Sequence, residues 1–170
     1  MAQIAQTVNV LQAVILTDNE KMLLTPTYWV FYLYKVHQDA TMIPIHFISN
    51  RLELPSSNIS AQPPRAGAGM GGRRGIDAVS ASASRDASGK VHITLVNIDP
   101  NNEQTVDCDL GKFAAKNVMG KALTSAKIND HNTFENPNNV TVKDFNGVRI
   151  DSGTLSVRLP SKSVVMLELW

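Results

Sequence analysis

Thr-Leu-Ser-Val-Arg-Leu-Pro-Ser-Lys-Ser-Val-Val-Met-Leu-Glu-Leu-Trp, residues 154–170, decides the fold class of this chain. Its first part alternates apolar and polar side chains, and its last part is a run of mostly apolar residues. Both patterns are typical of β-strands. Pro-Ser-Lys-Ser at 160–163 lies between them and is rich in turn-forming residues. We therefore predict two strands, 154–159 and 164–170, that pair as a closing hairpin.

The same alternation of short strands and turns extends upstream to residue 77. Further strands are predicted at 78–84, 91–98, 105–110, 117–125 and 140–144. Turn signals lie between them, including Ala-Ser-Gly-Lys at 87–90, Asp-Pro-Asn-Asn at 99–102 and Asn-Pro-Asn-Asn at 136–139. No helical pattern follows residue 40. Regular short strands of this kind predict a mainly β fold, an antiparallel jelly-roll β-sandwich.

A single helix is predicted before the strands, from residue 26 to about Gln38. Thr25 suits the N-cap and Pro26 the first helical position. From Tyr28 to Tyr34 the segment is aromatic or aliphatic at every position. A helix that is apolar all round needs cover on more than one side. We therefore expect this helix to pack on the sandwich or on another copy of the chain, which would make a homo-oligomer.

The segment between the helix and the main strand series is predicted to be irregular. Alternation at 41–47 indicates one strand. Residues 48–76 contain Gln-Pro-Pro-Arg-Ala-Gly-Ala-Gly-Met-Gly-Gly-Arg-Arg-Gly, which predicts a mobile Gly/Pro/Arg loop. The arginines raise the alternative of RNA contact, but no aromatic residue is interleaved to stack bases, so a plain loop is favoured.

Composition narrows the function classes. With 170 residues, 43% of them hydrophobic, the chain is long and apolar enough for a folded core, and a formal charge of +1 predicts no nucleic acid or membrane partner. The one cysteine, Cys108, excludes a disulfide within the chain and is expected to be a packed thiol. No signal-peptide pattern is visible, and the compartment stays open between cytoplasmic and secreted. No nucleotide or zinc motif occurs, so no cofactor is expected.

The candidate metal ligands are scattered histidines. His46 and His92 fall on predicted strands and could approach each other. A zinc site built from them would need further ligands in tetrahedral geometry. His131 lies in a long polar loop, which is either a ligand or interface contact or a loop held by Asx-type turns. We favour ordinary structural or surface histidines at His46, His92 and His131, and Asx turns in the loop.

The sequence offers no convincing pair of catalytic acids. A retaining glycosidase needs two carboxylates about 5–5.5 Å apart across a cleft. Asp18, Glu20 and Asp39 lie in polar turns or at a helix end, and Asp130 and Glu135 share a polar loop. None of them is framed by the apolar surroundings that raise the pKa of a catalytic acid.

Several motifs, in order along the chain, resemble the C-terminal part of the family 51 α-L-arabinofuranosidases. They are Ala-Gln-Thr-Val-Asn-Val-Leu-Gln-Ala-Val-Ile-Leu-Thr-Asp at 5–18, Met-Leu-Leu-Thr-Pro-Thr-Tyr at 22–28, Tyr-Lys-Val-His-Gln-Asp-Ala at 34–40, Val-Ser-Ala-Ser-Ala-Ser-Arg-Asp at 79–86, Asp-His-Asn-Thr-Phe-Glu-Asn-Pro at 130–137 and Leu-Pro-Ser-Lys-Ser-Val-Val-Met-Leu-Glu-Leu at 159–169. The resemblance covers nearly the whole chain except residues 48–76.

The resemblance implies two regions. Residues 1–40 would be the remnant of the last strand and helix of a (β/α)₈ barrel, and residues 41–170 the C-terminal β-sandwich. The family's enzymes release terminal arabinofuranose from arabinan and arabinoxylan of plant cell walls. Their two catalytic glutamates lie on earlier barrel strands and have no counterpart here. One substrate-binding position carries over, to Gln6, where the expectation is an exposed amide with no substrate to meet.

Three hypotheses follow. The first is an accessory sandwich that is catalytically inert alone. The second is a carbohydrate-binding or assembly module, with assembly favoured because the aromatic residues concentrate between Tyr28 and Tyr34. The third is a small enzyme with a new metal site on the sandwich, built from His46, His92 or His131.

Overall fold

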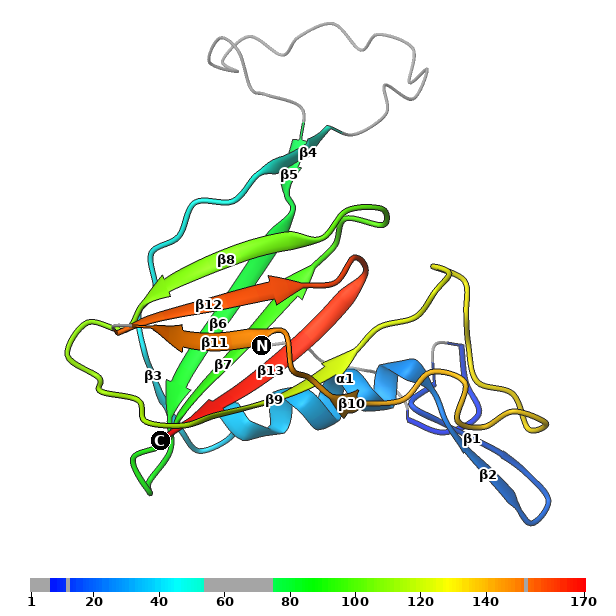
Figure 1. The fold of residues 1–170 in the computed structure, drawn as a ribbon. Helices are drawn as coiled ribbons and strands as arrows, with labels where there is room; N and C mark the ends of the chain where they lie inside the picture. The colour runs from blue at the N-terminus through cyan, green and yellow to red at the C-terminus, as the bar shows by residue number, and fades with distance from the viewer. Residues whose placement is uncertain (1–6, 12, 54–74, 152) are drawn as a thin grey trace, which may run out of the picture.

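The computed structural model describes residues 7–11, 13–53, 75–151 and 153–170, and it shows a mainly β protein with one α-helix in that part of the chain (Figure 1). The helical elements are α1 (Pro26–Tyr34) and the 3₁₀ turn η1 (Lys35–His37). The strands are β1 (Ile15–Asp18), β2 (Lys21–Leu24), β3 (Thr41–Met42), β4 (Arg51–Glu53), β5 (Gly75–Asp77), β6 (Val79–Arg85), β7 (Val91–Asn97), β8 (Gln104–Asp109), β9 (Val118–Leu123), β10 (Lys143–Asp144), β11 (Val148–Asp151), β12 (Thr154–Leu159) and β13 (Ser163–Leu169).

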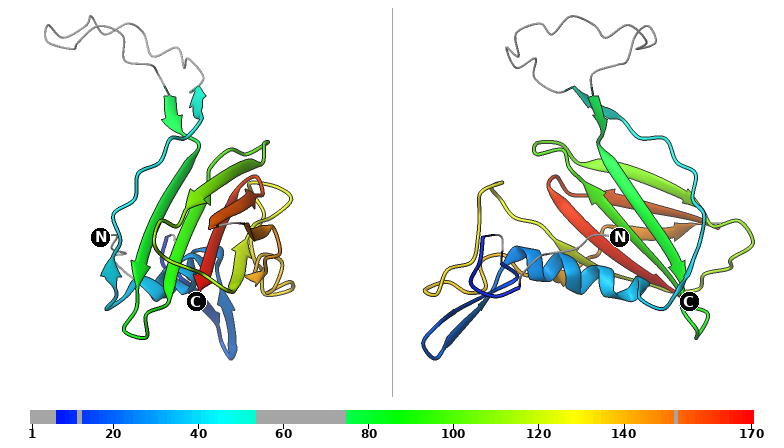
Figure 2. Two further views of the ribbon diagram at one scale, coloured as in Figure 1. Left: turned by 60° about the vertical axis from the view of Figure 1, so that its left-hand side comes forward. Right: turned by 180° about the vertical axis from the view of Figure 1, so that it is seen from behind.

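Two antiparallel sheets face each other and form the predicted sandwich. The larger has the order β10-β9-β13-β7-β6-β3 and the smaller the order β11-β12-β8 (Figures 1 and 2). Alternate residues of β12 and β13 are fully buried between them, which places the core where the apolar periodicity predicted. Phe145 closes one end of this core, and the backbone of Gly120 lies against its ring.

The prediction of a closing hairpin is wrong. β12 pairs with β11 and β8 in the small sheet, whereas β13 pairs with β7 and β9 in the large one. Both edges of both strands are therefore occupied, and the turn at 160–163 carries the chain from one sheet to the other. Lys162 adopts a positive φ of 51°, and its backbone N–H donates to Asp99 O at 2.9 Å. Asn97 Nδ2 stabilises this turn by donating to Pro160 O at 2.8 Å.

The strand predicted at 41–47 is also much shorter than expected. Only β3 pairs with β6, and Ile43 N makes one more bond, to Ala83 O at 2.9 Å. Pro44 follows and has no N–H with which to continue the ladder. The predicted loop at 48–76 begins and ends in paired strands, β4 and β5, while its residues 54–74 lie outside the described residues.

The sequence analysis missed two further features. Strands β1 and β2 form a hairpin around Asn19, whose φ is 51°, and this hairpin projects beyond the sandwich in Figures 1 and 2. Strand β11 was not predicted, and the strand predicted at 140–144 is reduced to β10. Val148-Arg149-Ile150-Asp151 of β11 does alternate apolar and polar side chains, but over four residues only, which is too short to stand out from its surroundings.

The helix forms where predicted and packs on the sandwich. Leu33 is fully buried in a second apolar cluster with Leu123, Val140 and Met166, so α1 lies against β9 and β13. Thr25 precedes the helix as expected but makes no side-chain cap. Among the described residues, no helix is long and apolar enough to cross a membrane. The division at residue 40 stays a prediction.

Candidate functional site

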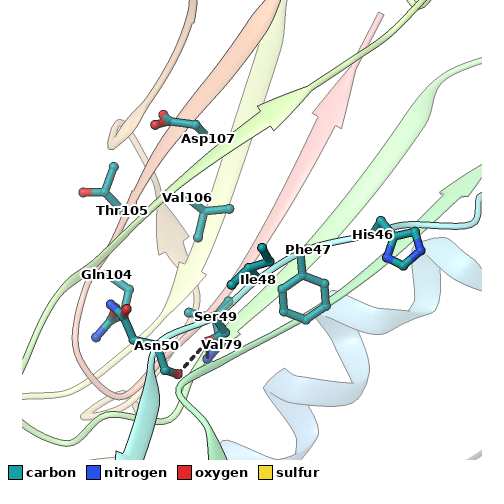
Figure 3. Close-up of a pocket in the computed structure, with 10 residues that line it drawn as sticks. All are labelled: His46, Phe47, Ile48, Ser49, Asn50, Val79, Gln104, Thr105, Val106 and Asp107. Atoms are coloured by element: carbon teal, nitrogen blue, oxygen red, sulfur yellow. Dashed lines mark hydrogen bonds between the residues drawn. The ribbon is translucent and has the colours of Figure 1, made fainter.

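A groove opens along one edge of the sandwich, between β6 and β8. It arises because the three-stranded sheet is narrower than the six-stranded one, and because residues 43–50 leave the edge of β6 instead of pairing with it. Two adjoining hollows of about 690 Å³ and 630 Å³ make up this groove. Figure 3 shows the second hollow, which lies between the segment 46–50 and β8.

The floor of the groove is aliphatic and its rim is polar. Floor residues come from the inner face of β6 and β7 and from β8, and they include Val79, Ala81, Ala83, Ile93, Leu95 and Val106. At the rim Asn50 Nδ2 donates to Gln104 Oε1 at 3.1 Å, which ties the crossing segment to β8. Val79 N donates to Ser49 Oγ at 2.9 Å (Figure 3).

The carboxylates that line the groove do not oppose each other. Asp107 and Asp109 are both exposed and lie two residues apart on the same strand, β8. Cys108 between them is partly buried against the core, and burial followed by the charge of Asp107 raises the pKa of its thiol. The contact with the core confirms the expected packed thiol.

A second polar cluster lies on the opposite, outer face of the large sheet. His92 is 4% exposed, its Nε2 lies 3.1 Å from Asp86 Oδ2, and its Nδ1 has no hydrogen-bond partner among the described residues. Glu168 Oε2 is 3.8 Å from that Nδ1, and the other carboxylate oxygen accepts from Lys90 Nζ at 2.7 Å. The imidazole of His92 thus lies between two carboxylates.

The charges of this cluster are held by turn and strand contacts. Asp86 accepts from Ser88 and from Lys90 N, and the Ser88 bond, followed by the His92 bond, lowers the pKa of Asp86 to about 2. The hydrogen bond to Glu168 raises the pKa of Lys90. These are the contacts of a structural network of polar and charged side chains around His92.

His37 joins the helical segment to this face of the sheet. Its Nδ1 lies 2.7 Å from Ser84 Oγ and its Nε2 lies 2.8 Å from Thr94 Oγ1, and both hydroxyl residues are buried. Burial, followed by the nearby charge of His92, lowers the pKa of His37. The end of the helix is therefore anchored by a neutral imidazole between two hydroxyls.

The structure separates the three histidines proposed as metal ligands. His46 lines the groove, His92 faces the outer side of the large sheet, and His131 lies exposed in the loop after β9. The alternative in which His46 and His92 approach each other is excluded, because His46 lines the groove on the inner side of the large sheet and His92 lies on its outer face. Within the described ranges, no group of three His, Cys, Asp or Glu side chains could hold a metal ion. Gln6 lies outside the described residues.

The loop at 125–139 is held by side-chain turns, as favoured from its sequence. Asp130 accepts from Ser125 Oγ and from Lys127 N, and the Ser125 bond lowers its pKa. Asn136 N donates to Thr133 Oγ1 at 3.1 Å. Sequence reasoning passed over one residue of this loop, Asn132, which is 5% exposed and bonds to Leu24 O. The only signal for it was the density of polar side chains.

Comparison with known proteins agrees with this architecture. The family model of the α-L-arabinofuranosidase C-terminal domain matches residues 1–163. An intracellular exo-α-L-arabinofuranosidase of Bacteroides ovatus is 43% identical over 169 residues, which are 99% of this chain and 30% of that relative. The chain thus spans less than a third of the length of this relative.

Solved structures show the same likeness. The family 51 arabinofuranosidase of Xanthomonas axonopodis pv. citri matches with a TM-score of 0.86 and 38% identity, over 100% of this chain and 31% of that one. An α-L-arabinofuranosidase of Thermotoga maritima, solved with arabinose, shares the fold at a TM-score of 0.74 and 23% identity, over 96% of this chain and 32% of that one. On its sequence and its fold, this chain belongs to the C-terminal domain family of the family 51 α-L-arabinofuranosidases.

Proposed function

We propose that this chain is the accessory β-sandwich region of an α-L-arabinofuranosidase and does not hydrolyse arabinofuranosides alone. The supporting observation is the placement of its carboxylates. Asp107 and Asp109 lie on the same strand and are exposed, while the space between Asp86 and Glu168 holds the imidazole of His92. Hydrolysis of a glycosidic bond by a retaining enzyme needs two carboxylates with open space between them for the sugar.

In the proposed role the sandwich supports the helix. Leu33 packs into the apolar cluster with Leu123, Val140 and Met166, and His37 is bonded to two buried hydroxyls of the large sheet. These contacts would hold the last helix of a barrel firmly on the sandwich. The complete enzyme would then release terminal arabinofuranosyl residues from plant cell-wall polysaccharide or oligosaccharide, the substrates that the family resemblance implies.

The test is hydrolysis of an aryl α-L-arabinofuranoside by the purified 170-residue chain. We expect no release above the buffer rate. The matched control is the double variant Asp86→Asn with Glu168→Gln, which removes both carboxylates beside His92. Hydrolysis that stays with the chain through successive columns and is lost in the double variant would overturn the proposal.

An assembly module is the second candidate, and the exposed apolar surface of the N-terminal region favours it. Phe31 is 42% exposed on α1, and Met22 of the neighbouring hairpin is 64% exposed. We propose that the helix between Tyr28 and Tyr34 associates with a second copy. The sandwich offers less for sugar binding, since its two aromatics exposed among the described residues, Phe47 and Trp170, come from the groove and from the chain end after β13.

Light scattering tests assembly, and binding isotherms test the carbohydrate alternative. We expect a species larger than the monomer that becomes monomeric in Phe31→Glu, together with flat isotherms against arabinan and xylan. A monomer at all concentrations would count against assembly, and a saturable isotherm would favour a binding module.

A further inference from the structure

The buried side chain of Asn132 connects the sandwich loop to the N-terminal hairpin. Its Nδ2 donates to Leu24 O at 2.8 Å and to Val140 O at 3.0 Å, and its Oδ1 accepts from Val140 N at 2.6 Å. Both amide hydrogens and the amide oxygen are therefore used. The two bonds to Val140 are local, whereas the bond to Leu24 joins residues 108 positions apart.

A second set of hydrogen bonds continues from Leu24 toward the N-terminus. Thr25 follows Leu24 directly, and its backbone N–H donates to Val14 O at 3.1 Å. Its hydroxyl lies 2.8 Å from Ala13 O and 3.1 Å from Val14 O, so it donates to this segment instead of capping the helix. The end of β2 is thus bonded to the sandwich loop through Leu24 and to residues 13 and 14 through Thr25.

The segment reached by Thr25 is itself bonded to the first described residue. Val14 N and Ile15 N both donate to Thr7 O at 3.0 Å. Two sets of hydrogen bonds, joined by the peptide bond between Leu24 and Thr25, therefore connect the loop of the sandwich to Thr7. The side chains at the centre of this path are buried or half-buried, where an unmet hydrogen-bonding group is costly.

We propose that Asn132 is a positioning residue, through which the sandwich sets the placement of Thr7 and of residues 13–15. This inference rests on the proposed function, because in the sequence Thr7 directly follows Gln6, the position that the family resemblance associates with the sugar. The sandwich would then do more than carry the helix. It would hold the start of the segment that leads away from the substrate-binding position.

The proposal can be tested on the 170-residue chain by amide hydrogen exchange, which reports local opening. Asn132→Asp keeps an oxygen that accepts from Val140 N but loses the donor to Leu24 O. We expect the amides of Val14, Ile15 and Thr25 to exchange about tenfold faster, while the amide of Val140 keeps its protection. Asn132→Ala should accelerate all four.

Two matched variants separate positioning from a general loss of structure. Asn139 is exposed in the same loop and, among the described residues, its side chain donates to His131 O, so Asn139→Ala should leave the exchange at Val14 and Thr25 unchanged. Thr25→Val removes the hydroxyl alone and should accelerate Val14 and Ile15 without affecting Val140. This second variant leaves the sandwich loop intact and keeps the test open if the Asn132 variants fold poorly.

Three results would overturn the proposal. Unchanged exchange at Val14 and Thr25 in Asn132→Asp would overturn the proposal, and so would an equal acceleration throughout, including the amides of β13. Unchanged exchange at Val14 in Thr25→Val would break the second link and overturn it as well. None of these readouts involves activity, so hydrolysis by the chain would refute the proposed function without affecting this result.

Discussion

Replacing Leu33 with alanine tests whether the helix and the sandwich form one cooperative unit. Leu33 is fully buried among Leu123, Val140 and Met166, and it is the one residue of α1 that is fully covered. Leucine-to-alanine changes in protein cores cost about 2–5 kcal/mol, and the cost is higher where the cavity does not collapse. One side of this site is a sheet, and the other is a single helix whose Phe31 is exposed, so we expect the helix to relax partly into the cavity although His37 anchors its end. We therefore expect about 2–3 kcal/mol.

The measurement is urea unfolding followed by tryptophan fluorescence. Trp29 is partly buried against the cluster formed by Leu33, Leu123, Val140 and Met166, so its emission reports the docked state of the helix. The series is made with Trp170→Phe, which leaves Trp29 as the only tryptophan. With a slope of about 2 kcal/mol/M, the expected cost corresponds to a midpoint about 1–1.5 M lower in urea.

Phe31→Ala is the matched control, because Phe31 is on the same helix but 42% exposed. In the monomer its replacement should cost less than about 1 kcal/mol. If Leu33→Ala proved no more destabilising than Phe31→Ala, the reasoning that this helix is held through one buried face would be refuted. A separate early transition of Trp29 in the parent chain would show that the helix is not part of the cooperative unit.

Three further outcomes are expected. Because the folded-state pKa of His37 is lowered, the stability of the wild type should fall as the pH drops below about 6.5. His37→Gln should flatten this part of a curve of stability against pH. An unchanged slope would contradict the anchoring role of His37. The bonds from Ser88 and from His92 lower the pKa of Asp86 from 3.8 to about 2, so Asp86→Asn should reduce the loss of stability within that window in acid-unfolding curves. A curve parallel to the wild type would argue against these bonds. In Gly120→Ala the new Cβ would lie 2.8 Å from Phe145 O and 2.9 Å from its Cδ1. We expect the free energy of unfolding in urea to fall by about 1–3 kcal/mol. A change near zero would refute the tight contact.

The strands of the core could be predicted because alternation is a local property. In β8, for example, Val106 and Cys108 point to the core while Thr105 and Asp107 are exposed, and the pattern shows this directly. The helix start at Pro26 was predicted for the same kind of reason, since its signals lie within a few residues. The family resemblance likewise depended on short motifs in order along the chain.

The candidate site was predicted poorly because it depends on contacts between distant segments. His46 and His92 both fell on predicted strands, but the face on which each side chain lies follows from pairing and from where Pro44 ends the ladder. Nothing near Asn132 in the sequence shows that its amide reaches Leu24 O. Thr25 was correctly placed before the helix, yet its hydroxyl bonds to a segment twelve residues earlier.

The amino-acid sequence by itself determined most strands of the core, the apolar helix that starts at Pro26, and the family to which the chain belongs, because these follow from periodicity, turn residues and motifs that neighbouring residues carry. Only the tertiary structure decided that β12 and β13 lie in different sheets, and that the narrower sheet leaves a groove beside β6. Each strand edge can pair with more than one partner, and the burial of the whole core decides which pairing forms.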